Sequence, residues 1–160
     1  MPDTMKYVRE GRDVIVLRTF SKAYGLAGLR LGYGIARPDI INALEKARQP
    51  FNVNAMAQEA GIAALDDQAF VRRVLRACRR GAKRVCKFCR DNGIEFVPPA
   101  ANFILLKVGD GAKVFNELQK LGVIVRPMAP YKLPEWIRVS FGSDAENDKF
   151  LAAFKQVMGK

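Results

Sequence analysis

The sequence lacks histidine, and only three cysteines occur among its 160 residues. Cys78, Cys86 and Cys89 fall eight and three residues apart within a helical pattern, which places them on or near one helix face. A usual zinc set needs further ligands, and no histidine can complete one. The cysteines are therefore expected to be small packing residues in a reducing compartment, and no metal site is expected.

Long apolar runs and acidic residues are also scarce. No segment has the length of a membrane-spanning helix, and the first residues lack an apolar run behind a basic head, so we expect a cytoplasmic protein without a membrane partner. Lys and Arg number 27 against 16 Asp and Glu, a net charge of +11. Such a charge favours anionic partners, which include phosphorylated metabolites and nucleic acid.

The order of the predicted elements indicates an α/β fragment followed by a small α+β domain. Residues 14–17 predict a strand buried on both faces, residues 29–35 predict a second strand, and two helices follow, the second capped by Asn54. A long amphipathic helix is predicted over residues 68–92, ended by Gly93. The elements predicted after it are strands at 95–97, 103–106, 123–125 and 136–141 and helices at 112–121 and 145–158.

This pattern divides the chain into three parts. Residues 1–67 are expected to be the end of a larger α/β domain, residues 68–92 a connecting helix, and residues 93–160 the small α+β domain.

The residues with the clearest chemistry lie between Thr19 and Tyr33. Lys22 stands beside the hydroxyl of Ser21 on a glycine-bearing loop behind the first strand, and Arg30 follows eight residues later. Such a loop can bring an amine, a guanidinium and backbone donors to one anionic ligand. The same pattern also fits a solvated lysine and an arginine at the rim of a sheet, and composition does not separate the two.

The segment Ser21-Lys22 followed by Leu26-Ala27-Gly28-Leu29-Arg30-Leu31-Gly32-Tyr33 closely resembles the cofactor-lysine segment of class I/II aminotransferases. Its residue order is similar to that of the same segment in histidinol-phosphate aminotransferases. This resemblance implies that Lys22 forms the Schiff base with pyridoxal 5'-phosphate, and that Thr19, Ser21 and Arg30 hold the cofactor phosphate. A lysine near cationic Arg30 and partly shut from water would be shifted toward the neutral, reactive amine.

The resemblance covers nearly the whole chain. Residues 50–54, 99–105, 122–128 and 136–142 resemble the later segments of the same family. It implies that Arg138 clamps the carboxylate or phosphate of a small phosphorylated amine or amino-acid substrate, and that Arg126 helps to hold the phosphate. Histidinol phosphate and 2-oxoglutarate are the implied pair, and a homodimer is the implied assembly. Relatives that act on threonine phosphate, including decarboxylases, or on aromatic amino acids share these motifs.

The family residues that bind the pyridine nitrogen and ring lie well before the cofactor lysine, and only 21 residues precede Lys22 here. We therefore expect the 160-residue chain to be inactive or nearly so by itself, with exposed strand edges and apolar surface that promote self-association.

Two alternatives to a transaminase half remain. One is a non-catalytic remnant, and the other is a nucleic-acid-binding module built on the basic helix. The second is disfavoured because no aromatic residues are interleaved for base stacking and no groove-reading motif occurs.

Overall fold

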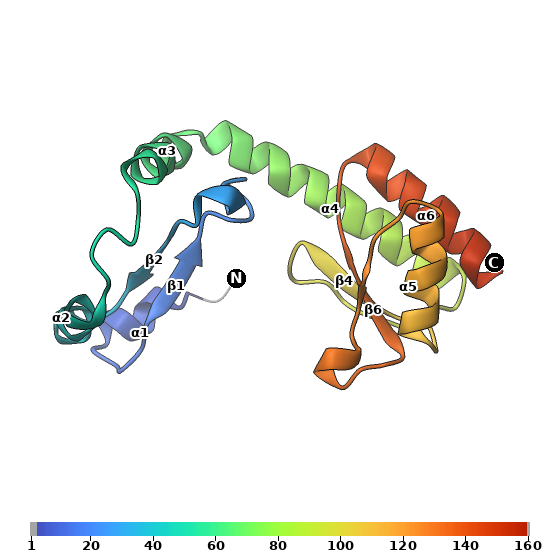
Figure 1. Cartoon of the computed structure of the whole chain (residues 1–160), viewed down its shortest axis with the longest axis horizontal. Helices are drawn as coiled ribbons and strands as arrows, with labels where there is room; N and C mark the ends of the chain where they lie inside the picture. The colour runs from blue at the N-terminus through green and yellow to red at the C-terminus, as the bar shows by residue number, and fades with distance from the viewer. Residues whose placement is uncertain (1–2, 160) are drawn as a thin grey trace. The chain divides into compact units, whose positions relative to one another are not determined.

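The computed structural model describes residues 3–159, which form two compact units that divide between Arg72 and Arg73. Both units combine helices and strands, so the predicted mixed α/β class is confirmed (Figure 1). Within the described residues, no helix is long and apolar enough to cross a membrane.

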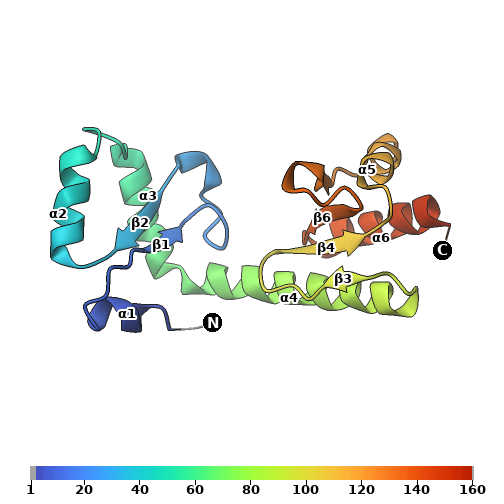
Figure 2. The same cartoon turned by 90° about the horizontal axis from the view of Figure 1, so that it is seen from below.

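The first unit is built around a two-stranded antiparallel sheet. Its elements are α1 (Met5–Arg9), β1 (Val16–Thr19), the 3-10 turn η1 (Ala27–Leu29), β2 (Gly32–Ile35), α2 (Pro38–Ala47) and α3 (Ala55–Asp66). β1 lies beside β2 in the register Val16↔Ile35 to Thr19↔Gly32 (Figure 2). The loop that joins these two strands carries Lys22.

The first strand differs from its prediction. It begins at Val16 instead of Val14, and its side chains are exposed after Val16, with Leu17 at 72%. Within the described chain β1 has one antiparallel neighbour, so the expected burial on both faces is wrong here. The second strand begins at Gly32 instead of Leu29, because η1 ends at Leu29 and Arg30 adopts a left-handed backbone conformation.

The predicted helix starts in this unit are confirmed. Pro38 stands in the first turn of α2, and the Asn54 side chain accepts a hydrogen bond from the Ala57 N–H at 2.9 Å. Arg37, just before α2, contacts Asp13 and Asp39, and this guanidinium lowers the pKa of Asp39. These contacts fix the start of α2 against the segment that precedes β1.

Large apolar side chains remain uncovered in the first unit. Phe51 is 95% exposed and Met56 79% exposed, and Leu17 and Ile62 are also exposed. The apolar surface predicted from the sequence is therefore present in the described chain.

The second unit has a four-stranded antiparallel sheet in the order β3-β4-β6-β5. Its elements are most of α4 (Gln68–Asp91), then β3 (Phe96–Val97), β4 (Phe103–Lys107), α5 (Gly111–Lys120), β5 (Arg126–Pro127), the 3-10 turn η2 (Ala129–Tyr131), β6 (Trp136–Ser140) and α6 (Asp144–Met158).

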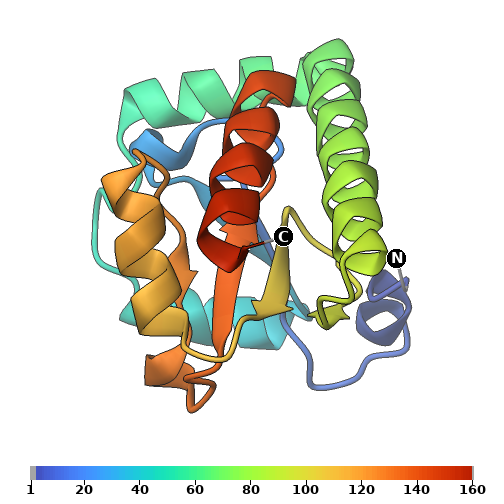
Figure 3. The ribbon, with the colours of Figure 1, turned by 90° about the vertical axis from the view of Figure 1, so that its right-hand side faces the viewer.

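One face of this sheet forms the main core. Side chains alternate along the strands, so that Ile104 and Leu106 of β4 and Ile137 and Val139 of β6 are buried. Helices α4, α5 and α6 cover that face, in green, orange and red in Figure 3. The other face carries the intervening residues, among them Arg138.

Two of the cysteines belong to this core. Cys86 and Cys89 are buried among its apolar residues, and burial raises the pKa of the Cys89 thiol from 9.0 to about 11. Among residues 3–159 no group of three or more potential ligands is arranged to hold a metal ion.

The predicted strand at residues 123–125 is not paired. Val123 and Val125 are buried and Ile124 is 80% exposed, which keeps the alternation of a strand, but the ladder with β6 contains only Arg126 and Pro127. Hydrophobic alternation thus predicted the burial of these side chains but not where pairing begins.

Candidate cofactor and anion sites

The loop between β1 and β2 is closed at its base by backbone hydrogen bonds. The Phe20 N–H donates to the Leu31 carbonyl at 3.1 Å, and the Leu26 N–H donates to the Phe20 carbonyl at 2.9 Å. Lys22 therefore follows one side of the closure and Arg30 precedes the other. The predicted amine and guanidinium belong to the two arms of one closed loop.

Packing beneath this closure holds the loop against α3. Phe20 is 4% exposed and contacts the ring of Tyr24, with 4.8 Å between centroids. A Cβ on Gly61 of α3 would lie 2.4 Å from a methyl carbon of Leu31, so a larger residue at position 61 would require the Leu31 side chain to move. The base of the loop is thus fixed by apolar contacts.

Hydroxyl groups and a tight turn surround Lys22. The Ser21 N–H donates to Thr19 Oγ1 at 3.0 Å, and the Gly25 N–H donates to the Lys22 carbonyl at 2.9 Å. Gly25 adopts φ 72°, a conformation that favours glycine. The Lys22 side chain is exposed, so the partial shielding expected from the sequence is wrong for this chain, because no described residue covers this side of the loop.

Arg30 has a backbone in the left-handed region at φ 55°. Its Nη1 donates to the Ala27 carbonyl at 2.7 Å, which fixes the guanidinium within the loop. In the described chain its remaining N–H groups have no protein partner, and the side chain is exposed. They are therefore available to an anion.

In the second unit, the register of the sheet sets the other two predicted arginines directly opposite each other. Arg126 of β5 pairs with Arg138 of β6, and opposite residues of an antiparallel ladder project from the same face. The Arg138 guanidinium also lies over the ring of Phe103, 5.2 Å from its centroid. In the described chain neither guanidinium has a carboxylate partner.

A groove of about 590 Å³ adjoins this pair. It is lined by residues 122–126, residues 138–142 and, from α6, Glu146, Asn147, Lys149 and Phe150. Three of the lining residues are cationic, namely Arg126, Arg138 and Lys149. Glu146 is the one lining residue with a carboxylate. This groove has the charge of an anion site.

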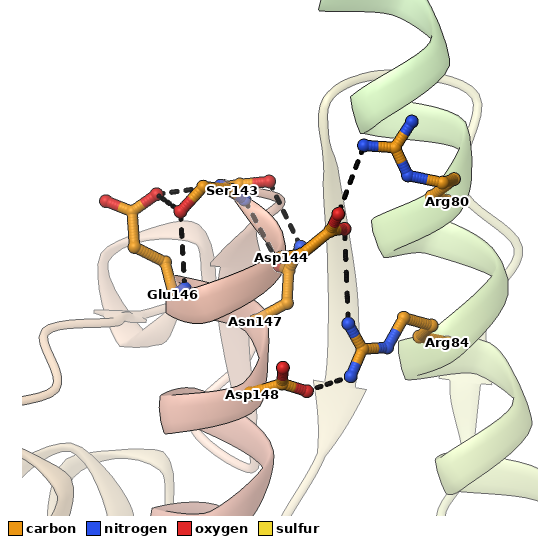
Figure 4. Close-up of polar contacts among 8 residues, drawn as sticks. Arg80, Arg84, Ser143, Asp144, Glu146, Asn147 and Asp148 are labelled. Atoms are coloured by element: carbon orange, nitrogen blue, oxygen red, sulfur yellow. Dashed lines mark hydrogen bonds and ion pairs between the residues drawn. The ribbon is translucent and has the colours of Figure 1, made fainter.

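The carboxylate of Glu146 is already bound within the start of α6. Ser143 donates to it from its N–H and its hydroxyl, both at 2.7 Å, and these contacts lower the pKa of Glu146. Buried Asn147 bonds both the N–H and the carbonyl of Gly142 (Figure 4). The rim of the groove is therefore fixed by a capping box and an amide clamp.

The sequence is similar to a family profile and to curated proteins over nearly its whole length. The sequence profile of the family described as "Aminotransferase class I and II" matches residues 3–154. The chain belongs to this family. A histidinol-phosphate aminotransferase of Akkermansia muciniphila is 52% identical over 157 residues, which are 98% of this chain and 43% of that protein. A second one, of Geobacillus, is 43% identical over 98% of this chain and 43% of its own length.

Solved structures of aminotransferases agree with this assignment. Histidinol-phosphate aminotransferase from Sinorhizobium meliloti, in complex with pyridoxal-5'-phosphate, matches with a TM-score of 0.82 at 35% identity, over 92% of this chain and 41% of that one. The enzyme from Clostridium acetobutylicum matches with a TM-score of 0.89 at 27% identity, over 98% and 49%. This aminotransferase-family chain thus spans less than half the length of these relatives.

Two features near Arg126 and Arg138 were not predicted from the sequence. These are the ring of Phe103 beside the Arg138 guanidinium and the place of Lys149 in the groove lining. Both depend on strand register and on the placement of α6. The available signal was the alternation of β4, which puts Phe103 on the open face.

Proposed function

We propose that this chain is the cofactor-lysine and substrate-arginine portion of a pyridoxal-phosphate-dependent transaminase that acts on histidinol phosphate and 2-oxoglutarate. The observation that carries the proposal is the closed loop, which contains Lys22, Ser21 and Arg30. The residue order of this segment resembles that of the family. In this proposal residues 1–67 form the end of the large cofactor-binding domain and residues 93–160 form the small domain. Residues 68–92 form the helix that connects them.

The groups on the loop fit a phosphate. Thr19 Oγ1 accepts a hydrogen bond from the Ser21 N–H, which leaves the Thr19 O–H free to donate. The Ser21 side chain supplies another hydroxyl. Arg30 uses one N–H on Ala27 and keeps donors for a planar anion. Thr19, Ser21 and Arg30 would therefore hold the phosphate of pyridoxal 5'-phosphate.

Lys22 has the central chemical role in this proposal. When bound, pyridoxal phosphate supplies the electron sink that lets the substrate α-carbon lose a proton. The Lys22 amine would hold the cofactor before reaction and then act as the base that moves this proton. The short turn closed by the Gly25 N–H on the Lys22 carbonyl fixes the backbone of Lys22 next to Ser21 in the chain.

Arg126 and Arg138 would bind the anionic groups of the substrates. Two guanidinium groups on one face, without carboxylate partners, match a phosphate or carboxylate. The choice of histidinol phosphate rests on the names of the most similar relatives. Assembly as a homodimer would cover the exposed apolar residues of the first unit.

Low activity is proposed for the 160-residue chain by itself. An exposed Lys22 lies in water, where electrostatic contacts to the reacting groups are weak. Further protein that covers the loop would be needed for efficient transfer.

Complementation tests this function. The amino-terminal portion of the Akkermansia relative, which this chain does not match, would be co-expressed with this chain and assayed for transfer from histidinol phosphate to 2-oxoglutarate. We expect activity in the co-purified complex, little in the chain alone, and loss with Lys22→Ala. Equal activity with Lys22→Ala, or none from a co-purified complex, would refute the proposed activity.

A further inference from the structure

The exposed face of α4 carries a line of cations that the proposed transaminase chemistry does not use. Arg76, Arg79 and Lys83 follow one another at spacings of three and four residues, which places them on one side of the helix. Lys87 and Arg90 continue the line, so it extends over about 21 Å at 1.5 Å per residue. All five residues are exposed.

The opposite face of α4 is packed in the core. Val85 and Cys89 are fully buried there, among the apolar residues of the sheet and the other two helices. The cation line, defined as Arg76, Arg79, Lys83, Lys87 and Arg90, therefore faces solvent.

Two neighbouring cations of α4 are paired with carboxylates of α6, but three members of the line are not paired in the described chain. Arg80 lies 3.2 Å from Asp144, and Arg84 contacts Asp144 and Asp148 of α6 (Figure 4). Within residues 3–159, by contrast, the side chains of Arg76, Arg79 and Lys83 have no hydrogen bond, ion pair or ring contact.

The remaining two members have weak partners. Lys87 reaches Asp91 at 2.6 Å in an exposed pair, and Arg90 lies 6.0 Å from the ring centroid of Phe96. Exposed pairs of this kind hold a cation only weakly. Lys87 and Arg90 can therefore exchange these contacts for a stronger anion.

We propose that the cation line binds the phosphate backbone of double-stranded nucleic acid without reading its sequence. Cations spaced along a straight helix complement a polyanion. When they neutralise its phosphates, the counterions condensed on the nucleic acid are released, and this release drives binding. The line contains no aromatic or amide side chain for base recognition. The absence of interleaved aromatic residues and of a groove-reading motif, which argued against nucleic acid from the sequence, does not oppose backbone binding.

An acidic membrane is a poorer partner for this surface. A helix that lies in a bilayer interface inserts an apolar face beside its cations. The apolar face of α4 is buried in the core, so the cation line offers charge alone. Duplex nucleic acid needs nothing more for sequence-independent binding.

The salt dependence of DNA binding tests the proposal. The whole chain would be titrated against two short duplexes of unrelated sequence, from roughly 50 to 200 mM salt. The slope of log affinity against log salt should be about −0.9 for each phosphate contact, so R76Q/R79Q/K83Q should reduce its magnitude by about 2.7. The two duplexes should bind equally.

A matched control separates the line from overall charge. K113Q/K132Q/K155Q removes the same charge from residues outside α4 and should leave the slope nearly unchanged. Glutamine has a helix propensity close to that of Arg and Lys, and circular dichroism would confirm that both variants fold. Equal loss in the two variants would assign binding to the diffuse charge of +11 and overturn the proposal. Binding to phosphatidylserine vesicles but not to duplex DNA would also overturn it.

Discussion

Replacing Arg126 with Gln should stabilise the second unit in buffer that lacks binding anions. Arg126 and Arg138 are opposite residues in the ladder, with Cα atoms about 5.5 Å apart for a hydrogen-bonded pair. Like charges in this position destabilise a sheet by about 0.2–1 kcal/mol, and solvent exposure favours the lower part of that range. Each 1 kcal/mol corresponds to about 4–8 °C in Tm for a unit of this size.

Phosphate should reverse the order of stability. If the two guanidinium groups share a phosphate, the wild type gains about 2.7 kcal/mol at a hundredfold excess over Kd, and Arg126→Gln gains much less. The single tryptophan, Trp136 of β6, reports unfolding of this unit by fluorescence. Lys113→Gln removes a charge without a partner opposite it and should change little.

Two results would refute this reasoning about the arginine pair. One is that Arg126→Gln is less stable than the wild type without phosphate. The other is that the two proteins gain equally from phosphate.

Three further predictions concern the second unit. Leu106→Ala should lower the free energy of unfolding by about 2–5 kcal/mol, because Leu106 is fully buried; a urea midpoint within error of the wild type would contradict this. Ser143→Ala should cost about 1 kcal/mol through its cap. Ser143 lowers the pKa of Glu146, so their contact contributes stability above the ordinary pKa of Glu. This part of the stability lost in Ser143→Ala should disappear as the pH falls through the lowered pKa of Glu146. Urea unfolding of both proteins across acidic pH would measure it. Because burial raises the pKa of Cys89 to about 11, Cys89 should react with thiol reagents more slowly than half-buried Cys78, and its contribution to stability should decline between pH 9.0 and about 11.

Local signals predicted the ends of several helices well. Asn54 caps α3 as expected, and Gly93 and Gly122 adopt positive φ where helices were predicted to end. These features depend on a few neighbouring residues, so the sequence contains them directly.

Features that depend on distant partners were not predictable from periodicity. The apolar run at residues 14–17 indicated a buried strand, but hydrophobicity does not reveal which layer covers it, and Leu17 is exposed in this chain. Similarly, the sequence suggested Arg126 and Arg138 as anion ligands, yet only strand register sets them face to face.

The roles of Lys22 and its neighbours came from resemblance to a family. Composition alone did not distinguish Lys22 from a solvated loop lysine. The closure from Phe20 to Leu31 requires pairing of two strands, which the residue types alone did not specify.

The most direct test of the account is borohydride trapping of pyridoxal phosphate on the purified chain, followed by peptide mapping. Lys46→Ala is the matched control for Lys22→Ala, because Lys46 is another exposed lysine of the first unit. We expect a permanent cofactor bond at Lys22, retained in Lys46→Ala and lost in Lys22→Ala. Labelling spread over many lysines, or unchanged in Lys22→Ala, would contradict the assignment of Lys22 as the cofactor lysine.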